Sequence, residues 1–187
     1  MTAHSDKTLH KVWHKVWCVG DDIDTDALAP GAYMQHGIDV IAQHCLENVL
    51  PHFSAQVRPG DIIVAGRNFG IGSSREQAAA ALKHLGVAAV IAPSYGGLFF
   101  RNAFNLGLLL VTSPDTDVLQ NQELLAHVSH RLKVTFNPEK QIKTAPTPDF
   151  LLDLVRAGGL VNQLKQTLNH TNPNNQTDQT KQPTEQP

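Results

Sequence analysis

Short runs of consecutive apolar residues alternate with longer segments whose apolar positions recur every three or four residues. Uninterrupted apolar runs are typical of strands buried on both faces, whereas the spacing of three or four is typical of amphipathic helices. The pattern predicts strands over residues 61–66, 87–94 and 108–112, and helices over 74–86 and 96–107. Strands that alternate with helices in this way predict an α/β fold with a parallel sheet.

The segments before and after this unit show the same two patterns. Residues 11–20 are rich in Val and Trp and predict a strand, and helical spacing of apolar residues predicts a helix over 37–49. Residues 131–144 predict a β-hairpin with its turn at Asn137–Pro138. Residues 148–168 predict one helix, or two helices separated at Gly158–Gly159.

The two ends of the chain differ from this patterned region. Residues 169–187 contain no Ala, Val, Ile, Leu, Met, Phe, Tyr or Trp. Such a segment buries too little apolar surface to offset the entropy lost on ordering, so we expect a disordered polar tail. Residues 1–10 are expected to form a flexible N-terminus. The remaining residues, 11–168, are predicted to form one domain.

Composition narrows the classes of protein that fit. The net charge of this 187-residue chain is −2, which argues against a general nucleic-acid or membrane surface. No apolar run approaches the roughly 20 residues that span a bilayer. The only cysteines, Cys18 and Cys45, form no CxxC pair and are expected to be reduced. We therefore expect a cytoplasmic protein whose own residues bind no metal.

The segment GRNFGIGSSREQA, residues 66–78, is the clearest candidate for chemistry. Ser73 and Ser74 are each followed three residues later by Glu76 or Gln77, which is the capping-box pattern of a helix start. A helix N-terminus carries free N–H groups and partial positive charge, which suit an anion.

The neighbouring residues strengthen this candidate for an anion site. Gly70 and Gly72 would let a ligand approach the backbone closely, and Arg75 offers a guanidinium that matches a carboxylate in two-point contact. The segment lacks the Gly-Lys-Ser/Thr of a phosphate loop, the third glycine of a dinucleotide loop and the Gly-x-Ser-x-Gly of an esterase. An ordinary strand-to-helix turn with an exposed arginine remains the alternative.

The same segment resembles the Gly-Ser-Ser-Arg-Glu signature of the swivelling domain in the aconitase superfamily. Its nearest likeness is to the small subunits of 3-isopropylmalate dehydratases. Further segments resemble that family in the same order, namely VWCVGDDIDTDALAPGAYM, VRPGDIIVAGRNFG, GVAAVIAPSYGGLFFRNAFNLGLLLV and PDFLLDLVRAGGLVNQLK. The resemblance covers roughly residues 12–168.

The resemblance implies a swivelling β/β/α fold and a two-subunit hydro-lyase. A separate large subunit would carry a [4Fe–4S] cluster, so this chain is expected to bind no cofactor itself. The substrate would be a small hydroxy-dicarboxylic acid, here 2-isopropylmalate and 3-isopropylmalate of leucine biosynthesis. Related hydratases of the dimethylmaleate, citraconate or homoaconitate type remain alternatives, as does a non-catalytic paralogue.

The family also implies roles for individual residues. Ser73 would be the catalytic base, acting as an alkoxide, and Asp26 would help to orient the site. The substrate-binding residues would be Gly72, Ser74, Arg75 and Arg101.

The loop that sets substrate choice would contain Tyr33, Met34, Gln35 and His36. It holds no arginine to pair with an additional carboxylate, and Met34 suits an alkyl side chain. The loop therefore favours alkyl malates over tricarboxylic substrates.

The sequence departs from the usual family pattern at three places. Ile71 stands where a cysteine is usual, Gln77 where a histidine is usual, and Gly97 where an arginine is common. The change at Gly97 removes a positive charge from the neighbourhood of the expected site. It therefore affects the prediction of the substrate more than that of the fold.

Overall fold

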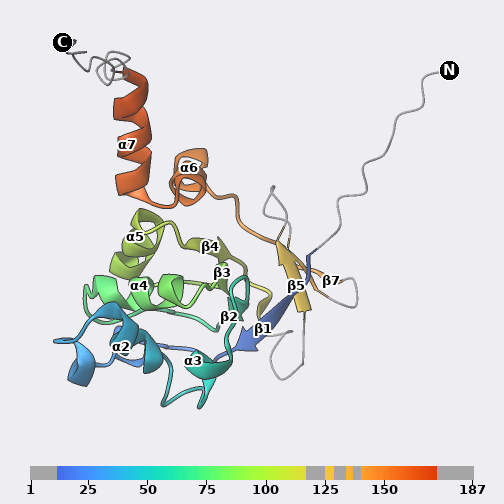
Figure 1. Ribbon diagram of the computed structural model, residues 1–187. Coiled ribbons are helices and arrows are strands. Elements are labelled where there is room, and N and C mark those ends of the chain that lie inside the picture. Colours follow the sequence, from blue (N-terminus) through green and yellow to red (C-terminus); the bar gives the residue numbers. More distant parts are fainter. Residues whose placement is uncertain (1–11, 117–124, 129–133, 137–139, 172–187) are drawn as a thin grey trace, which may run out of the picture.

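The computed structural model describes residues 12–116, 125–128, 134–136 and 140–171. Their strands form a seven-stranded sheet in the order β4-β3-β2-β1-β5-β6-β7 (Figure 1). Four neighbouring strands are parallel, namely β1 (His14–Cys18), β2 (Ile62–Val64), β3 (Ala89–Ala92) and β4 (Leu109–Thr112). The other three extend the sheet with antiparallel pairs, namely β5 (Leu125–Val128), β6 (Val134–Phe136) and β7 (Lys140–Gln141).

Helices connect the parallel strands and continue after the sheet. The chain order from β2 to β4 is β2, α4 (Glu76–His84), β3, α5 (Gly97–Asn105), β4, as the apolar pattern predicts. The remaining helices are α1 (Thr25–Leu28), the 3-10 turn η1 (Gly31–Tyr33), α2 (Ile38–Gln43), α3 (Phe53–Gln56), α6 (Asp149–Ala157) and α7 (Leu160–Thr171).

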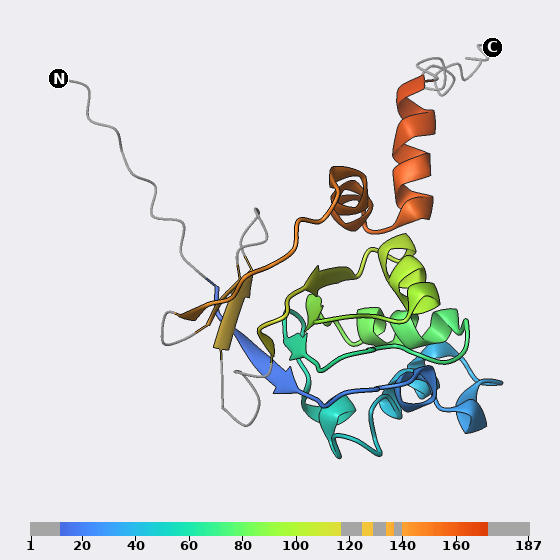
Figure 2. The same ribbon diagram turned by 180° about the vertical axis from the view of Figure 1, so that it is seen from behind.

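Strands β2, β3 and β4 are buried on both faces, which explains their uninterrupted apolar runs, whereas β1 is only partly buried. Ile63, Val90 and Leu110 belong to the core that packs against the helices. On the other face, Ile62 and Ile91 belong to a second core that includes side chains of the antiparallel strands, namely Ala126, Val134 and Phe136. Figures 1 and 2 show α2, α4 and α5 together on one side and β5 with β7 at the far end. The result is the expected β/β/α arrangement.

The helix predicted over 37–49 is shorter than expected. Helix α2 ends at Gln43, and Leu46 adopts a left-handed φ of 59°, which ends helical geometry. The backbone N–H of Leu46 donates to the carbonyl of Ala27 at 2.7 Å, so the chain turns to pack beneath α1. Cys45 and Leu46 are fully buried there, and their apolar character reflects that turn rather than a helix.

The C-terminal helical segment divides at the two glycines. Gly158 has φ 77° and Gly159 has φ 115°, both in the region that favours glycine. A Cβ atom on Gly159 would lie 2.6 Å from the carbonyl oxygen of Asn105, so the close approach to α5 also needs glycine. Of the two alternatives for this segment, two helices is the correct one.

Some predictions concern residues outside the described ranges. These are the flexible N-terminus (1–10), most of the polar tail (172–187) and the Asn137–Pro138 turn, although the antiparallel pairing of β6 with β7 confirms the hairpin. Helix α7 runs to Thr171, so residues 169–171 are helical rather than disordered. In the described part of the chain, no helix combines the length and apolar character needed to cross a bilayer.

Candidate active site

The candidate site lies beyond the carboxyl ends of β1, β2 and β3, where the chain stays extended and in register. Asp24 forms a parallel bridge with Ile71, and Phe69 forms another with Tyr95. The N–H of Gly70 donates to the carbonyl of Ile23 at 2.6 Å. These contacts bring the acidic loop and the glycine–serine segment side by side. Sites in parallel α/β sheets form at this edge.

Ser73 is held by Thr25, which is the first residue of α1. The N–H of Ser73 donates to Thr25 Oγ1 at 3.1 Å, and the two hydroxyl oxygens also lie 3.1 Å apart. Because Thr25 Oγ1 accepts the backbone N–H, its own hydrogen can be donated to Ser73 Oγ. Thr25 is only 2% exposed, whereas Ser73 is exposed to solvent. Ser73 therefore presents its hydroxyl from a fixed backbone.

The expectation that Ser73 or Ser74 caps the following helix is wrong. Helix α4 begins at Glu76, its N-cap residue is Arg75, and no side chain caps it. The Ser73 side chain is engaged with Thr25, and the Ser74 carbonyl accepts a hydrogen bond from Asn102 Nδ2 at 3.2 Å. The positive end of α4 therefore lies just beyond the serines, and neither serine hydroxyl is used to cap the helix.

Arg75 is anchored through one nitrogen. Its Nη1 donates to Asp26 Oδ1 and to the carbonyl of Ala29, both at 2.7 Å. Within the described residues, Nε and Nη2 have no hydrogen-bond partner. These two atoms form the edge of a guanidinium that binds a carboxylate in two-point contact. The anchoring thus leaves that edge open.

Asp26 is the residue that positions Arg75. The Asp26 side chain is 62% exposed, against 24% for Arg75. The hydrogen bond from Arg75, and next the one from the Gly31 N–H at 2.9 Å, lower the pKa of the Asp26 carboxyl. Asp26 therefore stays ionised near neutral pH and joins Arg75 to the start of the loop at Gly31.

The two glycines of the signature have different environments. Gly70 has φ 75°, and a Cβ there would lie 2.2 Å from Phe99 Cγ, so internal packing occupies the space expected for a ligand. The prediction for Gly70 is therefore wrong. Gly72 has φ 103°, and a Cβ there would lie 3.2 Å from Thr25 Oγ1. Glycine at position 72 thus keeps the approach of Ser73 to Thr25 clear.

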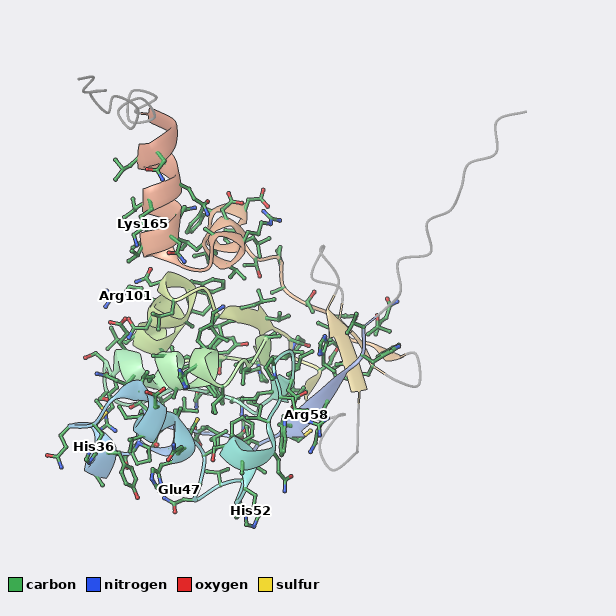
Figure 3. All side chains as sticks on the ribbon, in the orientation of Figure 1. His36, Glu47, His52, Arg58, Arg101 and Lys165 are labelled. Carbon is green, nitrogen blue, oxygen red and sulfur yellow. The ribbon has the colours of Figure 1, made fainter. Side chains whose placement is uncertain are left out.

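The expected specificity loop divides into inward and outward side chains. Tyr33 stacks on the ring of His44 with centroids 3.6 Å apart, and His44 Nδ1 lies 2.6 Å from Glu47 Oε2. Met34 is partly buried against the helix-side core. Gln35 and His36 are exposed, and Figure 3 shows His36 pointing away from the ribbon.

Helix α5 contributes residues that lie next to the glycine–serine segment. Asn102 contacts the Ser74 carbonyl, and the neighbouring Arg101 is exposed and points outward in Figure 3. Gly97 begins α5, and no atom lies within 4 Å of where its Cβ would be. The departure at Gly97 therefore opens space, whereas a Cβ on Gly96 would lie 2.3 Å from the Gly70 carbonyl oxygen.

Sequence reasoning missed two residues of this site, Thr25 and Asn102. Both act through contacts between segments far apart in the chain, Thr25 with Ser73 and Asn102 with Ser74. Only the position of Thr25 inside the Asp-Thr-Asp motif could have indicated its role.

The described residues offer no ligand set for a metal ion or cluster. No group of three or more His, Cys, Asp or Glu side chains lies close enough together to bind one. Cys45 is buried and Cys18 is half-buried, and burial raises the pKa of both thiols, which disfavours the thiolate that a cluster needs. An iron–sulfur cluster therefore does not fit the described residues of this chain.

Known proteins match the chain over most of its length. Residues 24–116 match the aconitase C-terminal domain. The methanogen homoaconitase small subunit of Methanothermobacter thermautotrophicus is 44% identical over 156 residues, covering 82% of this chain and 91% of that protein. The 3-isopropylmalate dehydratase small subunit of Thermodesulfovibrio yellowstonii is 42% identical over 161 residues, covering 84% and 96%.

A solved structure agrees with these matches. The crystal structure of 3-isopropylmalate dehydratase from Methanocaldococcus jannaschii matches with a TM-score of 0.79 and 36% identity, covering 87% of this chain and 98% of that one. The likeness thus extends from the sequence to the order and packing of the elements. The chain belongs to the aconitase superfamily, in the family of 3-isopropylmalate dehydratase and homoaconitase small subunits, and carries that superfamily's swivelling domain.

Proposed function

We propose that this chain is the small subunit of a two-subunit hydro-lyase that interconverts 2-isopropylmalate and 3-isopropylmalate. The observation that carries the proposal is the arrangement of Ser73 on Thr25 beside an Arg75 whose carboxylate-binding edge is open. The identities of 40% or more to several small subunits of 3-isopropylmalate dehydratase support the same function.

Ser73 is the proposed base of the reaction. An alkoxide at Ser73 Oγ takes the proton from the carbon beside a substrate carboxylate, and returns a proton when water adds back. An alkoxide needs positive potential and hydrogen-bond donors around it. Thr25 Oγ1–H at 3.1 Å can donate to it, and the uncapped start of α4 and the Arg75 guanidinium add positive potential. The proton thus moves between substrate carbon and Ser73 Oγ.

Arg75 is the proposed carboxylate anchor. Its Nε and Nη2 would bind one substrate carboxylate in two-point contact while Asp26 and the Ala29 carbonyl hold Nη1. Ser74, Gly72 and Arg101 complete the proposed substrate-binding set. Because Arg75 follows Ser73 by two residues, the same segment would orient the carboxylate and present the base.

The large subunit is the proposed partner, and the [4Fe–4S] cluster belongs to it in this proposal. That cluster would supply the Lewis acid for the substrate hydroxyl. The relatives named as small subunits, together with the lack of a ligand set in the described residues, support this division of roles. The cytoplasm is the proposed compartment.

The expected specificity loop favours an alkyl-substituted substrate over homoaconitate. Residues 31–37 contain no Arg or Lys to pair with an additional carboxylate, and an unpaired carboxylate would lose about 1.5–3 kcal/mol. Homoaconitate is the second candidate, because the methanogen homoaconitase small subunit is 44% identical to this chain. The open space at Gly97 is compatible with either substrate.

A substrate panel on the reconstituted enzyme tests the proposal. The chain and its cognate large subunit would be mixed anaerobically, and formation of the unsaturated intermediate followed by absorbance with isopropylmalate, dimethyl-substituted malate, citramalate and homocitrate. We expect the highest kcat/KM with isopropylmalate. A preference for homocitrate would select the second candidate. No turnover of any of these acids, with an intact cluster, would indicate a non-catalytic paralogue.

A further inference from the structure

Helix α7 projects from the body of the molecule (Figures 1 and 2). It contacts α6 and, near its start, α5. Every side chain from residue 161 to residue 169 is exposed except that of Gln163, which is half-buried. Most of the helix therefore has no cover from the described residues.

One face of this exposed helix is apolar. Val161, Leu164 and Leu168 are 63%, 53% and 67% exposed, and their spacing of three and four residues places them in one row, here named the α7 stripe. Leu160 at the start of α7 and Phe150 on α6 add 38% and 65% exposed apolar side chains. Gln166 lies on the opposite face of the helix, about 180° from the centre of the stripe.

Beyond its contacts with α6 and α5, most of α7 lacks the packing that usually stabilises a helix of this length. An isolated helix of 12 residues is marginal in water, and most helices in proteins are stabilised by packing of their apolar face. The residues that follow α7, 172–187, contain no Ala, Val, Ile, Leu, Met, Phe, Tyr or Trp. These residues therefore have no apolar side chains that could cover the α7 stripe.

We propose that the α7 stripe docks into an apolar groove of the large subunit. This inference rests on the proposed function, which requires a large subunit. Anchors at positions i, i+3 and i+7 are the usual signature of a helix received by a groove. The relatives of this chain are small subunits, so a second protein is the expected occupant.

The position of α7 relative to the candidate site supports that occupant. Helix α5 contacts the site through Asn102, which donates to the Ser74 carbonyl, and it also contacts α7. Arg101 lies midway along α5, and Figure 3 shows it pointing outward from that helix. A large subunit that closes over Ser73 and Arg101 would therefore extend to α7, and the two contacts would form one continuous interface.

Matched charge variants test the docking. Leu164→Glu and Leu168→Glu place a charge in the stripe, and Gln166→Glu places the same charge on the opposite face. All three side chains are exposed in the isolated chain, so we expect unchanged circular dichroism. We expect the Kd for the large subunit to rise by about 30-fold or more for each leucine variant and by less than about 3-fold for Gln166→Glu.

A second experiment measures protection of the α7 backbone directly. Amide hydrogen exchange of residues 161–169 should slow when the large subunit is added to the wild-type chain. Leucine variants that bind the large subunit within about 3-fold of wild type, or unchanged exchange in α7 on complex formation, would overturn the docking.

Self-association of the chain through the α7 stripe would indicate a different binding partner for the stripe. A wild-type dimer that Leu164→Glu converts to monomers, with unchanged affinity for the large subunit, would assign the stripe to a second copy and overturn the proposal. A complex that forms through the stripe but turns over no substrate would instead contradict the proposed function and leave the docking supported.

Discussion

At the scale of single residues, Thr25 makes two of the contacts that hold the proposed base, Ser73. It is buried, begins α1, and contacts both the N–H and the hydroxyl of Ser73 at 3.1 Å. The nearest described hydroxyl to the proposed base is therefore also the acceptor that fixes its backbone. Removing that hydroxyl would leave a part-buried N–H without its partner, which typically costs about 1–3 kcal/mol.

Thr25→Val tests this role at almost constant volume. We expect kcat to fall by roughly 10- to 100-fold with a smaller change in KM, because the alkoxide loses a donor while Arg75 keeps its anchors. Thr25→Ser retains the hydroxyl and should recover most of kcat. Equal losses in the Val and Ser variants would mean that the methyl group, rather than the hydroxyl, matters.

The Asp26–Arg75 pair gives a prediction about pH. Hydrogen bonds lower the pKa of Asp26, so the stabilisation from its ionised form is present above its unfolded pKa and is lost only as pH falls through the lower folded value. Asp26→Asn should therefore reduce kcat/KM by roughly 3- to 10-fold, evenly from about pH 6 to about pH 9. A loss that varied across this range would show that Asp26 titrates within it.

The sequence allowed candidate residues of the site to be named, but it did not allow their contacts to be predicted. Ser73, Arg75 and Asp26 belong to short motifs, so the sequence identified them as candidates. Their geometry depends on the register between segments almost 50 residues apart, as in the contact of Thr25 with Ser73 across 48 positions. No local pattern encodes that register. The capping box failed for the same reason, because Thr25 engages the Ser73 side chain.

At the scale of elements, Gly70 and Gly97 have different structural environments. Gly70 combines a φ of 75° with a Cβ position already occupied by the Phe99 ring, whereas Gly97 lies at the start of α5 with open space around it. A glycine can therefore allow close packing between elements, as at Gly70, or leave room at a surface, as at Gly97.

A pair of alanine variants separates these two reasons. Gly70→Ala should lower the free energy of unfolding by more than about 2 kcal/mol, since it adds backbone strain and a clash with Phe99. Gly97→Ala should leave stability unchanged or raise it by about 0.4–1 kcal/mol. Urea denaturation measures both. Similar effects of the two substitutions would contradict the packing described for Gly70.

The apolar pattern predicted the parallel unit because each strand there is buried on both faces and each helix on one. It failed where apolar residues are buried without regular structure, as at Cys45 and Leu46 beyond α2. The single-turn helices α1 and α3 are too short to show a period, so they were missed.

At the scale of the whole molecule, the fold places the site at an open edge. The parallel strands bring their carboxyl ends together, the loops beyond them leave Ser73 and Ser74 exposed, and helix α5 leaves Arg101 exposed. A base that works as an alkoxide needs a site from which bulk water is excluded. The described residues do not enclose Ser73, and in the proposed function the large subunit supplies that closure.

The most direct test of this account is the turnover of Ser73→Ala in the complex with the large subunit, with Ser74→Ala as the matched control. We expect Ser73→Ala to lower kcat by about 100- to 10,000-fold while KM and the affinity between subunits stay near wild type. Ser74→Ala should mainly raise KM, since Ser74 is assigned to substrate binding. A Ser73→Ala enzyme that retains more than about a tenth of wild-type kcat would contradict the central claim that Ser73 is the base.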